Sequence, residues 1–321
     1  MYATSSHKRH WIFANPEALA EQRRLVNERF VSLRQPYIAE DDNFEGFPNS
    51  EEELVIVRVV SHTGVRFANE FKPTLPLPVR WIAFMYFKRF YTKVCSLQLN
   101  TAPKRMMMVC FFLAAKVYEF NISTSQFVSN LRSGDAASNA DNILKLEPKL
   151  MEELNYELTV HTPYKAFEGH LLEMKARMSL LGFDLEQLRP HAMEFFEKAM
   201  IGDAMLLYAP THIALAALKY ALEKCDKSVE ILKDFFYRFL DLDAFNSREE
   251  DREQVQKVLN HVGAICDMVL QQGKPIPANN ETADIKRRIH DVYLFATKLD
   301  ERLRNNPSAQ QTEEGNDSDS D

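Results

Sequence analysis

The sequence predicts an all-α protein made of two tandem five-helix repeats, flanked by an N-terminal and a C-terminal helix. Glycine is rare, at 9 of 321 residues, which disfavours loop-rich and all-β folds. From Met106 to Ala115 no polar side chain occurs, so a helix expected over 103–120 is apolar on every face, like the central rod of a helical bundle. The helix starts expected near residues 51, 78, 103, 124 and 140 recur near 163, 185, 210, 228 and 248, at a spacing of roughly 107 residues.

Composition disfavours several classes of function. The apolar run 106–115 is shorter than the ~20 residues that a membrane span needs. Residues 1–13 contain no apolar core long enough for a secretory signal, so we expect no association with a membrane. A net charge of −7 gives no electrostatic reason for direct nucleic-acid binding. The cysteines are scattered without a C-x-x-C pair, which favours buried, reduced thiols.

The N-terminal segment is expected to contain one helix. Asn15 can cap this helix and Pro16 suits its first position, since the N–H that proline lacks would have no partner there. The helix should run to about Arg34. Trp11 and Phe13 are large apolar side chains just ahead of it, and we expect them to dock on the main body.

The first repeat is expected to begin after a connector over residues 35–49. Ser50 followed by Glu53 forms a capping box, and the helix that it opens should run to about Phe71. The β-branched run at 54–60 favours a strand by propensity. The cap and the uninterrupted length favour a helix, and we predict a helix.

Prolines and polar caps predict the remaining boundaries of the first repeat. The expected features are, in order, a helix from Pro78 to Thr92, the apolar rod, a capping box of Ser123 and Gln126 with a helix end at Gly134, and a cap at Asn139 for a helix ending near Asn155.

The second repeat follows the same order. Ala102-Pro103 and Ala209-Pro210 fall in register, and each opens an apolar central helix. Ser247 with Glu250 should cap the last helix of the repeat, and Gly273 should stop it. We therefore expect five parts: residues 1–49 with one helix, a first repeat over 50–160, a second over 161–273, a C-terminal helix over 274–304, and a disordered acidic tail over 305–321.

The C-terminal helix, expected to begin after Asn280, is amphipathic. Its single apolar stripe consists of Ile285, Ile289, Val292, Ala296, Leu299 and Leu303. A single stripe needs a partner surface. We favour packing on the protein's own repeats or N-terminal helix, with an external partner as the alternative.

Motifs for catalysis, cofactor binding and metal binding are missing. The sequence has no G-x-G-x-x-G, G-x-x-x-x-G-K-[ST], H-E-x-x-H or G-x-S-x-G, and its histidines lack ligand spacing. We expect His161 and His212 to be packing or helix-end residues. The basic triplets 8–10 and 286–288 are expected to be solvated faces, with nuclear import or phosphate contact as the alternative. We predict a non-enzyme with no catalytic residue, cofactor or metal.

Two charged residues stand among apolar ones. Lys116 ends the apolar rod, and Glu147 lies at the centre of the inward stripe of the last helix of the first repeat, within ~40° of Ile143, Leu150 and Leu154. Because an unpaired carboxylate in an apolar setting is costly, we expect the two charges to pair at the edge of the bundle. The pair is either structural only, or a recognition point for a partner's backbone.

Several segments resemble the tandem cyclin boxes of the cyclin family. They are MYFKRFY (85–91), FLAAKVYEF (112–120), LNYEL (154–158) and LLYAPTHIALAAL (206–218). Within the family, three further segments resemble the cyclins of the CDK-activating kinase: SSHKRHWIF (5–13), EFNISTSQFVSNLR (119–132) and VHTPYKAFEGHLLEMK (160–175). The resemblance extends to about residue 304.

The resemblance implies a non-catalytic nuclear subunit that binds and activates cyclin-dependent kinase 7 together with a RING-finger assembly factor. Through that complex it would join TFIIH, supporting phosphorylation of other cyclin-dependent kinases and of the RNA polymerase II C-terminal domain. By motif position, Lys116 and Glu147 would hold the C-helix region of the kinase. The apolar positions that would pack on it are Leu113, Val117, Met151 and Tyr156. The alternatives are another transcriptional cyclin similar to cyclin C, and a non-kinase scaffold similar to TFIIB.

Two departures from the family pattern matter. Pro148 directly follows Glu147 and removes a helical hydrogen bond, so we expect the helix to kink or restart there. The opening helix of the first repeat lacks the M-R-x-I-L-x-x-W pattern with which cell-cycle cyclins recruit R-x-L substrates. We therefore predict no groove for R-x-L peptides.

Overall fold

The computed structural model describes residues 1–39, 42, 44–242 and 248–304, and every regular element in them is helical. The α-helices are α1 (Ser6–Trp11), α2 (Pro16–Arg34), α3 (Ser50–Glu70), α4 (Leu77–Phe90), α5 (Pro103–Val117), α6 (Thr124–Val128), α7 (Ala136–Glu153), α8 (Pro163–Arg177), α9 (Arg189–Ile201), α10 (Ala204–Leu207), α11 (Pro210–Lys224), α12 (Glu230–Phe239), α13 (Glu249–Gln272) and α14 (Asn280–Arg304). Short 3-10 helices are η1 (Tyr2–Thr4), η2 (Gln35–Tyr37), η3 (Leu99–Thr101) and η4 (Leu185–Leu188). The predicted all-α class is confirmed, and the four cysteines are free thiols as expected. None of the helices described could cross a bilayer, for want of a long enough apolar stretch.

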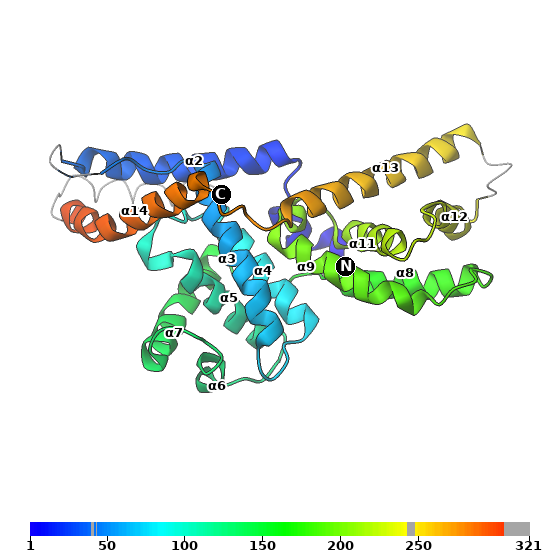
Figure 1. Cartoon of the computed structure of the whole chain (residues 1–321), viewed down its shortest axis with the longest axis horizontal. Helices are drawn as coiled ribbons and strands as arrows, with labels where there is room; N and C mark the ends of the chain where they lie inside the picture. The colour runs from blue at the N-terminus through cyan, green and yellow to red at the C-terminus, as the bar shows by residue number, and fades with distance from the viewer. Residues whose placement is uncertain (40–41, 43, 243–247, 305–321) are drawn as a thin grey trace.

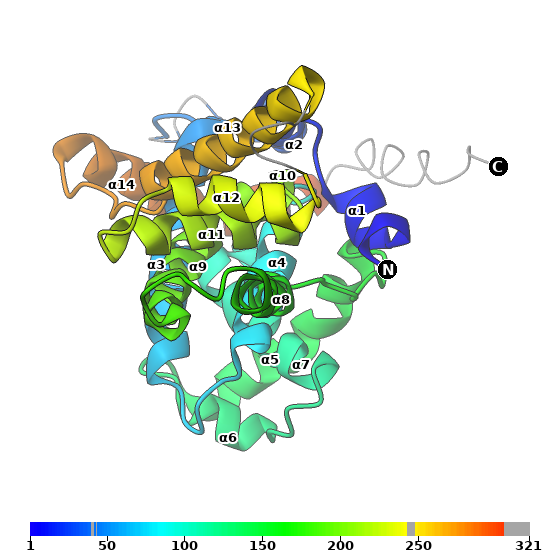
Figure 2. The same cartoon turned by 90° about the vertical axis from the view of Figure 1, so that its right-hand side faces the viewer.

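Two central helices organise the two repeats (Figure 1). α5 is packed against α3, α4 and α7, and α11 against α8, α9 and α13. Residues 109–115 of α5 and 213–218 of α11 are all buried. Pro103 and Pro210 open these helices, as the register between the repeats predicted. Figure 2 looks along α8, with α12 and α13 above it. The short α10, between α9 and α11, was not predicted.

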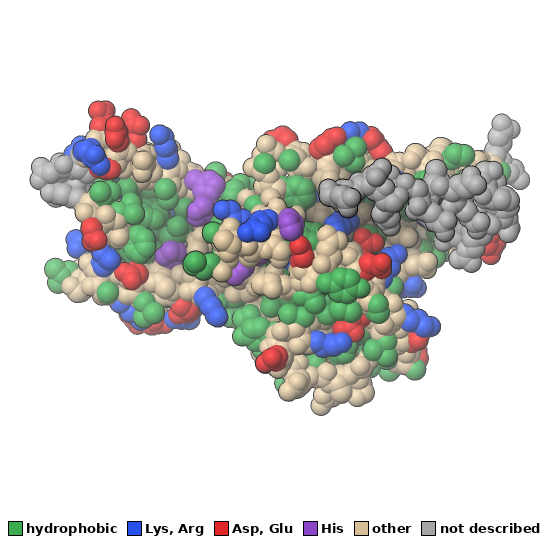
Figure 3. All heavy atoms as spheres, turned by 180° about the vertical axis from the view of Figure 1, so that it is seen from behind, with side chains coloured by type: hydrophobic (Ala, Val, Ile, Leu, Met, Phe, Trp, Pro, Cys, Tyr) green, Lys and Arg blue, Asp and Glu red, His purple; other side chains and the backbone are tan. Residues whose placement is uncertain are grey.

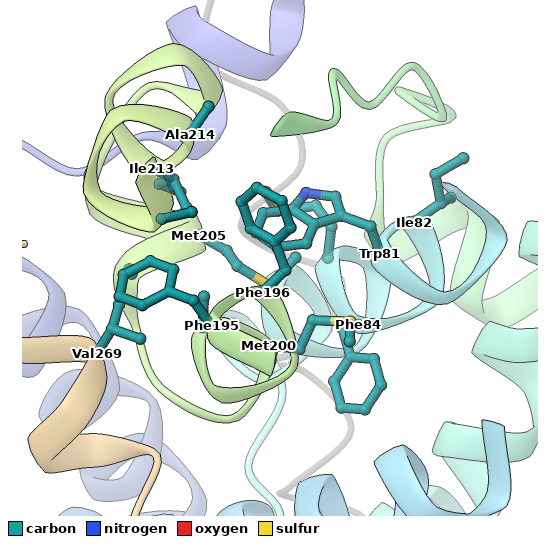
Figure 4. Packing of buried hydrophobic residues seen from close by; sticks show 14 of the residues in the cluster. Trp81, Ile82, Phe84, Phe195, Phe196, Met200, Met205, Ile213, Ala214 and Val269 are labelled. Carbon is teal, nitrogen blue, oxygen red and sulfur yellow. The ribbon is translucent and has the colours of Figure 1, made fainter. Parts of the chain in front are cut away.

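α4 and α9 join the two repeats into one hydrophobic core. Figure 4 shows Trp81 and Phe84 of α4 beside Phe196 and Met200 of α9. The rings of Trp81 and Phe196 meet edge to face, with centroids 6.1 Å apart. All four side chains are buried, so the junction gains both burial and favourable aromatic geometry.

The start of α3 differs from the prediction by one residue. Asn49 accepts a hydrogen bond from the N–H of Glu52 at 3.0 Å, and the Glu52 carboxylate accepts from the N–H of Asn49 at 2.8 Å. This capping box replaces the one predicted for Ser50 and Glu53. The physical reason is that Glu53 is turned into the core and is engaged there by other donors. The predicted helix through the β-branched run 54–60 is confirmed.

The loop between α6 and α7 also differs from the prediction. The predicted caps of α2 and α6 are present. However, α6 ends at Val128, well before Gly134, and Asp135 caps α7 in place of Asn139. Aspartate is as good a cap as asparagine and comes earlier in the chain, so it takes the position. The Asn139 amide instead donates to the Ser133 carbonyl at 3.0 Å, which fastens the loop to α7.

Helices of the second repeat begin close to their predicted positions. α8 begins at Pro163, whereas the helix predicted from Leu185 starts as η4 and becomes α9 at Arg189. α13 ends immediately before Gly273, as predicted. The predicted cap residue Ser247 lies outside the described residues.

The segment before α2 docks where the two repeats meet, as predicted for Trp11 and Phe13. The Trp11 indole N–H donates to Glu157 at 2.6 Å, and Trp11 is 2% exposed. The Phe13 ring packs against the core. His7 is fully buried; its Nδ1 accepts the backbone N–H of His161 at 3.0 Å, and the two imidazole rings stack.

We expect mild acid to release this N-terminal segment. Burial lowers the pKa of His7 from its usual 6.5 to about 3, and the nearby Arg89 and His161 add to the effect. Because the pKa is depressed in the folded state, docking is fully favourable above pH 6.5 and weakens as the pH falls towards 3. At pH 5 the cost of keeping His7 neutral is about 2 kcal/mol. In a Trp81→Phe background, Trp11 emission should therefore shift to the red between pH 7 and pH 5.

The control for this experiment is His7→Asn, which keeps an acceptor for the His161 N–H but does not titrate. The red shift should disappear in this variant, while the far-ultraviolet circular dichroism of both proteins stays constant. An equal shift in His7→Asn would show that another group governs the docking.

α14 packs on the protein's own N-terminal helix and first repeat, which is the alternative we favoured. The buried members of its stripe are Ile285, Ile289, Val292, Ala296 and Leu299. The first three join Phe30 of α2 and Leu97 in a second buried cluster, and Figure 1 shows α14 running beside α2. Leu303 was predicted to be the last member of this stripe, but its side chain is not among those that the structure describes.

Glu53 links α2, α3 and α14. Its Oε1 accepts from the Asn27 amide at 2.6 Å and from the Cys95 thiol at 3.2 Å. Its Oε2 accepts from the Ser96 N–H at 2.7 Å and the Ser96 hydroxyl at 2.6 Å. The Ser96 carbonyl in turn accepts from the Tyr293 hydroxyl of α14 at 2.7 Å. A single buried carboxylate of α3 thus satisfies donors from α2 and from the 95–96 loop, and that loop in turn accepts a hydrogen bond from α14.

Candidate functional site

Lys116 and Glu147 meet at one edge of the first repeat. α5 carries Lys116 in its last turn and α7 carries Glu147. The Lys116 Nζ lies 2.8 Å from the Glu147 Oε1, which confirms the predicted contact. The side chains are unequally exposed, at 52% for Lys116 and 8% for Glu147. The pair therefore combines a largely desolvated carboxylate with an ammonium that reaches solvent.

Pro148 does not interrupt the helix that presents Glu147. α7 runs from Ala136 to Glu153 without restarting, although the proline leaves the carbonyl of Leu144 without its usual donor. Glu147 shares the inward face with Ile143 and Leu150, which are completely buried. The direction of Glu147 is therefore the one that helical periodicity predicts.

The pair has hydrogen-bonding capacity to spare. Within the described part of the chain, the Glu147 Oε2 accepts no hydrogen bond, and the Lys116 ammonium uses one of its three donors. The ammonium also lies 5.6 Å from the centroid of the Phe112 ring, which favours one position for it. An acceptor and donors held at a fixed point are suited to the backbone of a bound partner.

Exposed apolar side chains lie on the same two helices and in the turn that follows α7. Among the residues predicted to contact a partner, Val117 is 38% exposed and Tyr156 is 68% exposed. Met151 is half-buried. Leu113 is 2% exposed and faces the core, so in the free chain it supports the turn that carries Lys116. Figure 3 shows hydrophobic side chains gathered on the lobe that the first repeat forms.

Two further exposed apolar residues were missed from the sequence. Tyr118, next to Val117, is 46% exposed, and Leu144, one turn before Glu147, is 55% exposed. Leu144 lies off the inward stripe of α7. An apolar residue away from that stripe was the available signal for a contact surface.

A strained reversal presents Tyr156. Asn155 and Tyr156 both have positive φ, at 51° and 56°, and the Tyr156 N–H donates to the Met151 carbonyl at 2.9 Å. Non-glycine residues in this region cost about 1–2 kcal/mol each. The reversal ends α7 and leaves the Tyr156 ring in solvent, although burial would favour folding. Backbone strain that leaves an aromatic ring exposed is a feature of binding surfaces.

The other chemistry-bearing residues have structural partners. His161 stacks on His7, and the His212 ring meets His261 edge to face at 5.0 Å, so both are packing residues as predicted. Among the residues that the structure describes, no group of three or more His, Cys, Asp or Glu side chains is arranged to hold a metal ion.

The basic triplet 286–288 is engaged in ion pairs. Arg287 lies 2.6 Å from Glu45, and Arg288 pairs with Glu52 at the start of α3. These contacts fasten α14 to the connector and to the first repeat. They favour a structural role over phosphate contact for this triplet.

Comparison with protein families matches both repeats. Residues 72–159 match the family described as the cyclin N-terminal domain, and residues 162–270 match the cyclin C-terminal domain. Among curated proteins, Cyclin-H of Xenopus laevis is 36% identical over 236 residues, covering 72% of this chain and 71% of its own length.

Two solved structures share the fold. A chain in the CAK complex of Chaetomium thermophilum bound to ATP-gamma-S superimposes with a TM-score of 0.73 at 20% identity, covering 100% of this chain and 97% of that chain. A chain in the yeast TFIIK (Kin28/Ccl1/Tfb3) complex superimposes with a TM-score of 0.62 at 25% identity, covering 84% of this chain and 100% of that chain.

Proposed function

The chain belongs to the cyclin family, and we propose that it is the regulatory subunit that binds and activates cyclin-dependent kinase 7. It has no catalytic role of its own. In the CDK-activating kinase it supports phosphorylation of other cyclin-dependent kinases, and within TFIIH it supports phosphorylation of the RNA polymerase II C-terminal domain. The observation that carries the proposal is the Lys116–Glu147 contact at an exposed, apolar edge of a chain similar to Cyclin-H.

The mechanism follows from what a protein kinase needs. Its active site requires contact between the β3 lysine and the C-helix glutamate, which depends on the position of the C-helix. A partner that binds only the inward C-helix shifts the kinase towards that state. Moving the equilibrium from 1:99 to 99:1 takes about 5.5 kcal/mol of differential affinity. An apolar surface around one fixed charged pair can supply binding energy of that size.

We assign the contacts as follows. Lys116 and Glu147 hold backbone groups of the kinase's C-helix region through the donors and the acceptor that they leave unused. Val117, Met151 and Tyr156 pack on that helix. Leu113 lies within the core and supports the turn that carries Lys116.

The assembly has further members. The yeast TFIIK complex, one chain of which shares this fold, contains three named subunits, Kin28, Ccl1 and Tfb3. By analogy, we infer that a RING-finger assembly factor is the third subunit here, that the core of TFIIH is reached only through the complex, and that the protein acts in the nucleus. Purification from nuclear extract, with the co-eluting subunits identified, tests this part of the proposal.

A kinase assay tests the main proposal. The purified chain should be inert, yet should activate purified cyclin-dependent kinase 7 towards a polymerase II C-terminal repeat peptide, with and without the assembly factor. Cyclin-dependent kinase 8 is the matched control. Activation of kinase 8 instead would favour the cyclin C-like alternative, and failure to bind either kinase would favour a scaffold similar to TFIIB.

A further inference from the structure

A small cavity lies where the N-terminal helix and the first repeat meet the second repeat. Its volume is about 30 Å³, and charged side chains from four segments line it. They are Arg23 of α2, Glu53 and Arg58 of α3, Lys88 of α4, and Asp203 between α9 and α10. We call this hollow the junction cavity. Neither member of the charged pair assigned to the kinase lines it.

Lys88 brings a buried ammonium to the junction cavity. The residue is 4% exposed, and its Nζ donates to the Ile201 carbonyl at 2.9 Å. An ammonium has three donors, so the other two have no acceptor among the residues that the structure describes. Burial lowers the pKa of Lys88 from its usual 10.5 to about 7. The attraction of Asp203 does not make up for this burial and for the repulsion from Arg23 and Arg58.

Arg58 brings a second cation that is incompletely used. Its Nε is buried and has no hydrogen-bond partner in the described part of the chain. Its Nη2 lies 3.8 Å from the Asp203 Oδ2, which is close enough for an ion pair but too far for a hydrogen bond. A buried donor without an acceptor is unfavourable, so the Arg58 Nε calls for one.

The two carboxylates at the cavity are already engaged. Asp203 accepts hydrogen bonds from both terminal nitrogens of Arg23, at 2.7 and 3.1 Å. Both oxygens of Glu53 accept from the network described above. Three cations and two carboxylates line the cavity, so one positive charge is in excess when Lys88 is protonated. One monovalent anion would balance it.

The size of the cavity limits the kind of ligand. One water molecule needs about 10–15 Å³ of such space, so the cavity has room for one or two waters or for a single halide ion. A phosphate group, with its four oxygens, is too large. The unused groups of Lys88 and Arg58 are all donors. An ion that only accepts hydrogen bonds therefore suits them better than water, which must also donate.

We propose that the junction cavity binds one chloride ion, held by the Lys88 ammonium and the Arg58 Nε. The ion supplies the acceptor that these donors lack and balances the excess positive charge. Beside it, Arg23 joins α2 to Asp203 of the second repeat. The bound ion therefore strengthens the junction of the N-terminal helix, α3, α4 and the second repeat, and chloride stabilises the folded chain.

Thermal unfolding of the full chain in chloride tests the proposal. Sodium chloride replaces sodium gluconate up to about 200 mM at constant ionic strength, and gluconate is too large for the cavity. A ligand that binds only the folded state stabilises it by mass action, so the melting temperature should rise by about 2 °C or more. A melting temperature that stays constant or falls as chloride replaces gluconate would overturn the proposal.

Variants locate the ion in solution. Arg58→Gln removes a charge and the Nε donor from the cavity, and it should lose more than half of the chloride-dependent rise. Lys88→Met, which removes the ammonium, should lose the rise as well. Arg66→Gln makes the same change as Arg58→Gln at an exposed position two turns further along α3, and it should keep the full rise. Equal rises in Arg58→Gln and Arg66→Gln would show that chloride acts elsewhere and overturn the assignment.

Bromide locates the ion in a crystal, because it has the same charge as chloride, is only slightly larger, and scatters anomalously. In crystals of the full chain grown with sodium bromide, the anomalous difference map should show a peak within hydrogen-bonding distance of the Lys88 Nζ and the Arg58 Nε. Water alone in the cavity, with bromide bound only at the surface, would contradict the proposal. The kinase takes no part in these measurements, so their failure is distinct from failure of the proposed function.

Discussion

Glu147→Ala is expected to weaken binding of cyclin-dependent kinase 7 by about 30-fold to several thousand-fold, with a matching loss of kinase activation. Removing one partner of a desolvated charge pair at an interface costs about 2–5 kcal/mol, and each 1.4 kcal/mol is about tenfold in affinity. Glu147 qualifies because its side chain is 8% exposed and its Oε2 is unused. Isothermal titration calorimetry with the purified kinase measures the loss, and circular dichroism establishes that the variant is folded.

Lys116→Ala should have a smaller effect, because the Lys116 side chain is 52% exposed and water already solvates part of its charge. The double variant should lose less than the sum of the single losses, since either substitution breaks the same contact. The matched control is Lys145→Ala, which removes an exposed pair with Asp141 on the same helix. If folded Glu147→Ala and Lys116→Ala bind the kinase as tightly as Lys145→Ala does, the pair is structural only.

The sequence was informative wherever local physics decides the outcome. Pro103 and Pro210 start the central helices because proline suits a first helical position whatever surrounds it. The Lys116–Glu147 contact was predictable because two isolated charges on apolar faces of neighbouring helices have few other ways to be satisfied. Pro148 did not change this, because α7 stays continuous through it and keeps Glu147 on the buried face with Ile143 and Leu150.

Boundaries and exposures were less predictable because distant residues decide them. Ser50 and Asn49 are both suitable caps for α3; Asn49 takes the position while Glu53 is drawn inward by Asn27 and Ser96. The residues next to Glu53 in the sequence do not predict those contacts, because Asn27 and Ser96 are distant in the chain. Similarly, the exposure of Leu144 depends on where α7 meets α5, and only the assembled repeat shows it.

Glu53→Ala is expected to lower the stability of the whole chain strongly. It leaves the Ser96 N–H and hydroxyl, the Asn27 amide and the Cys95 thiol without their acceptor in a buried place. A buried donor without a partner costs about 1–3 kcal/mol, so we expect a total loss of about 3 kcal/mol or more. The melting temperature should fall by about 5 °C or more. Hydrogen exchange in α14 should also accelerate, because the Tyr293 hydroxyl of α14 donates to the carbonyl of Ser96, which Glu53 holds in place.

Two further variants separate the effect of this network on stability from the effects of charge and of helix propensity. Glu51→Ala removes an exposed carboxylate from the same turn of α3, so it changes the net charge and the interaction with the helix N-terminus equally. It should change stability by about 0.5 kcal/mol or less. Glu53→Gln keeps one carbonyl acceptor for the Ser96 N–H, and the Ser96 hydroxyl can turn to accept from its amide, so the loss should fall between the other two. Equal melting temperatures for Glu53→Ala and Glu51→Ala would mean that water replaces the carboxylate without cost, and that the Glu53 network does not help to hold α14.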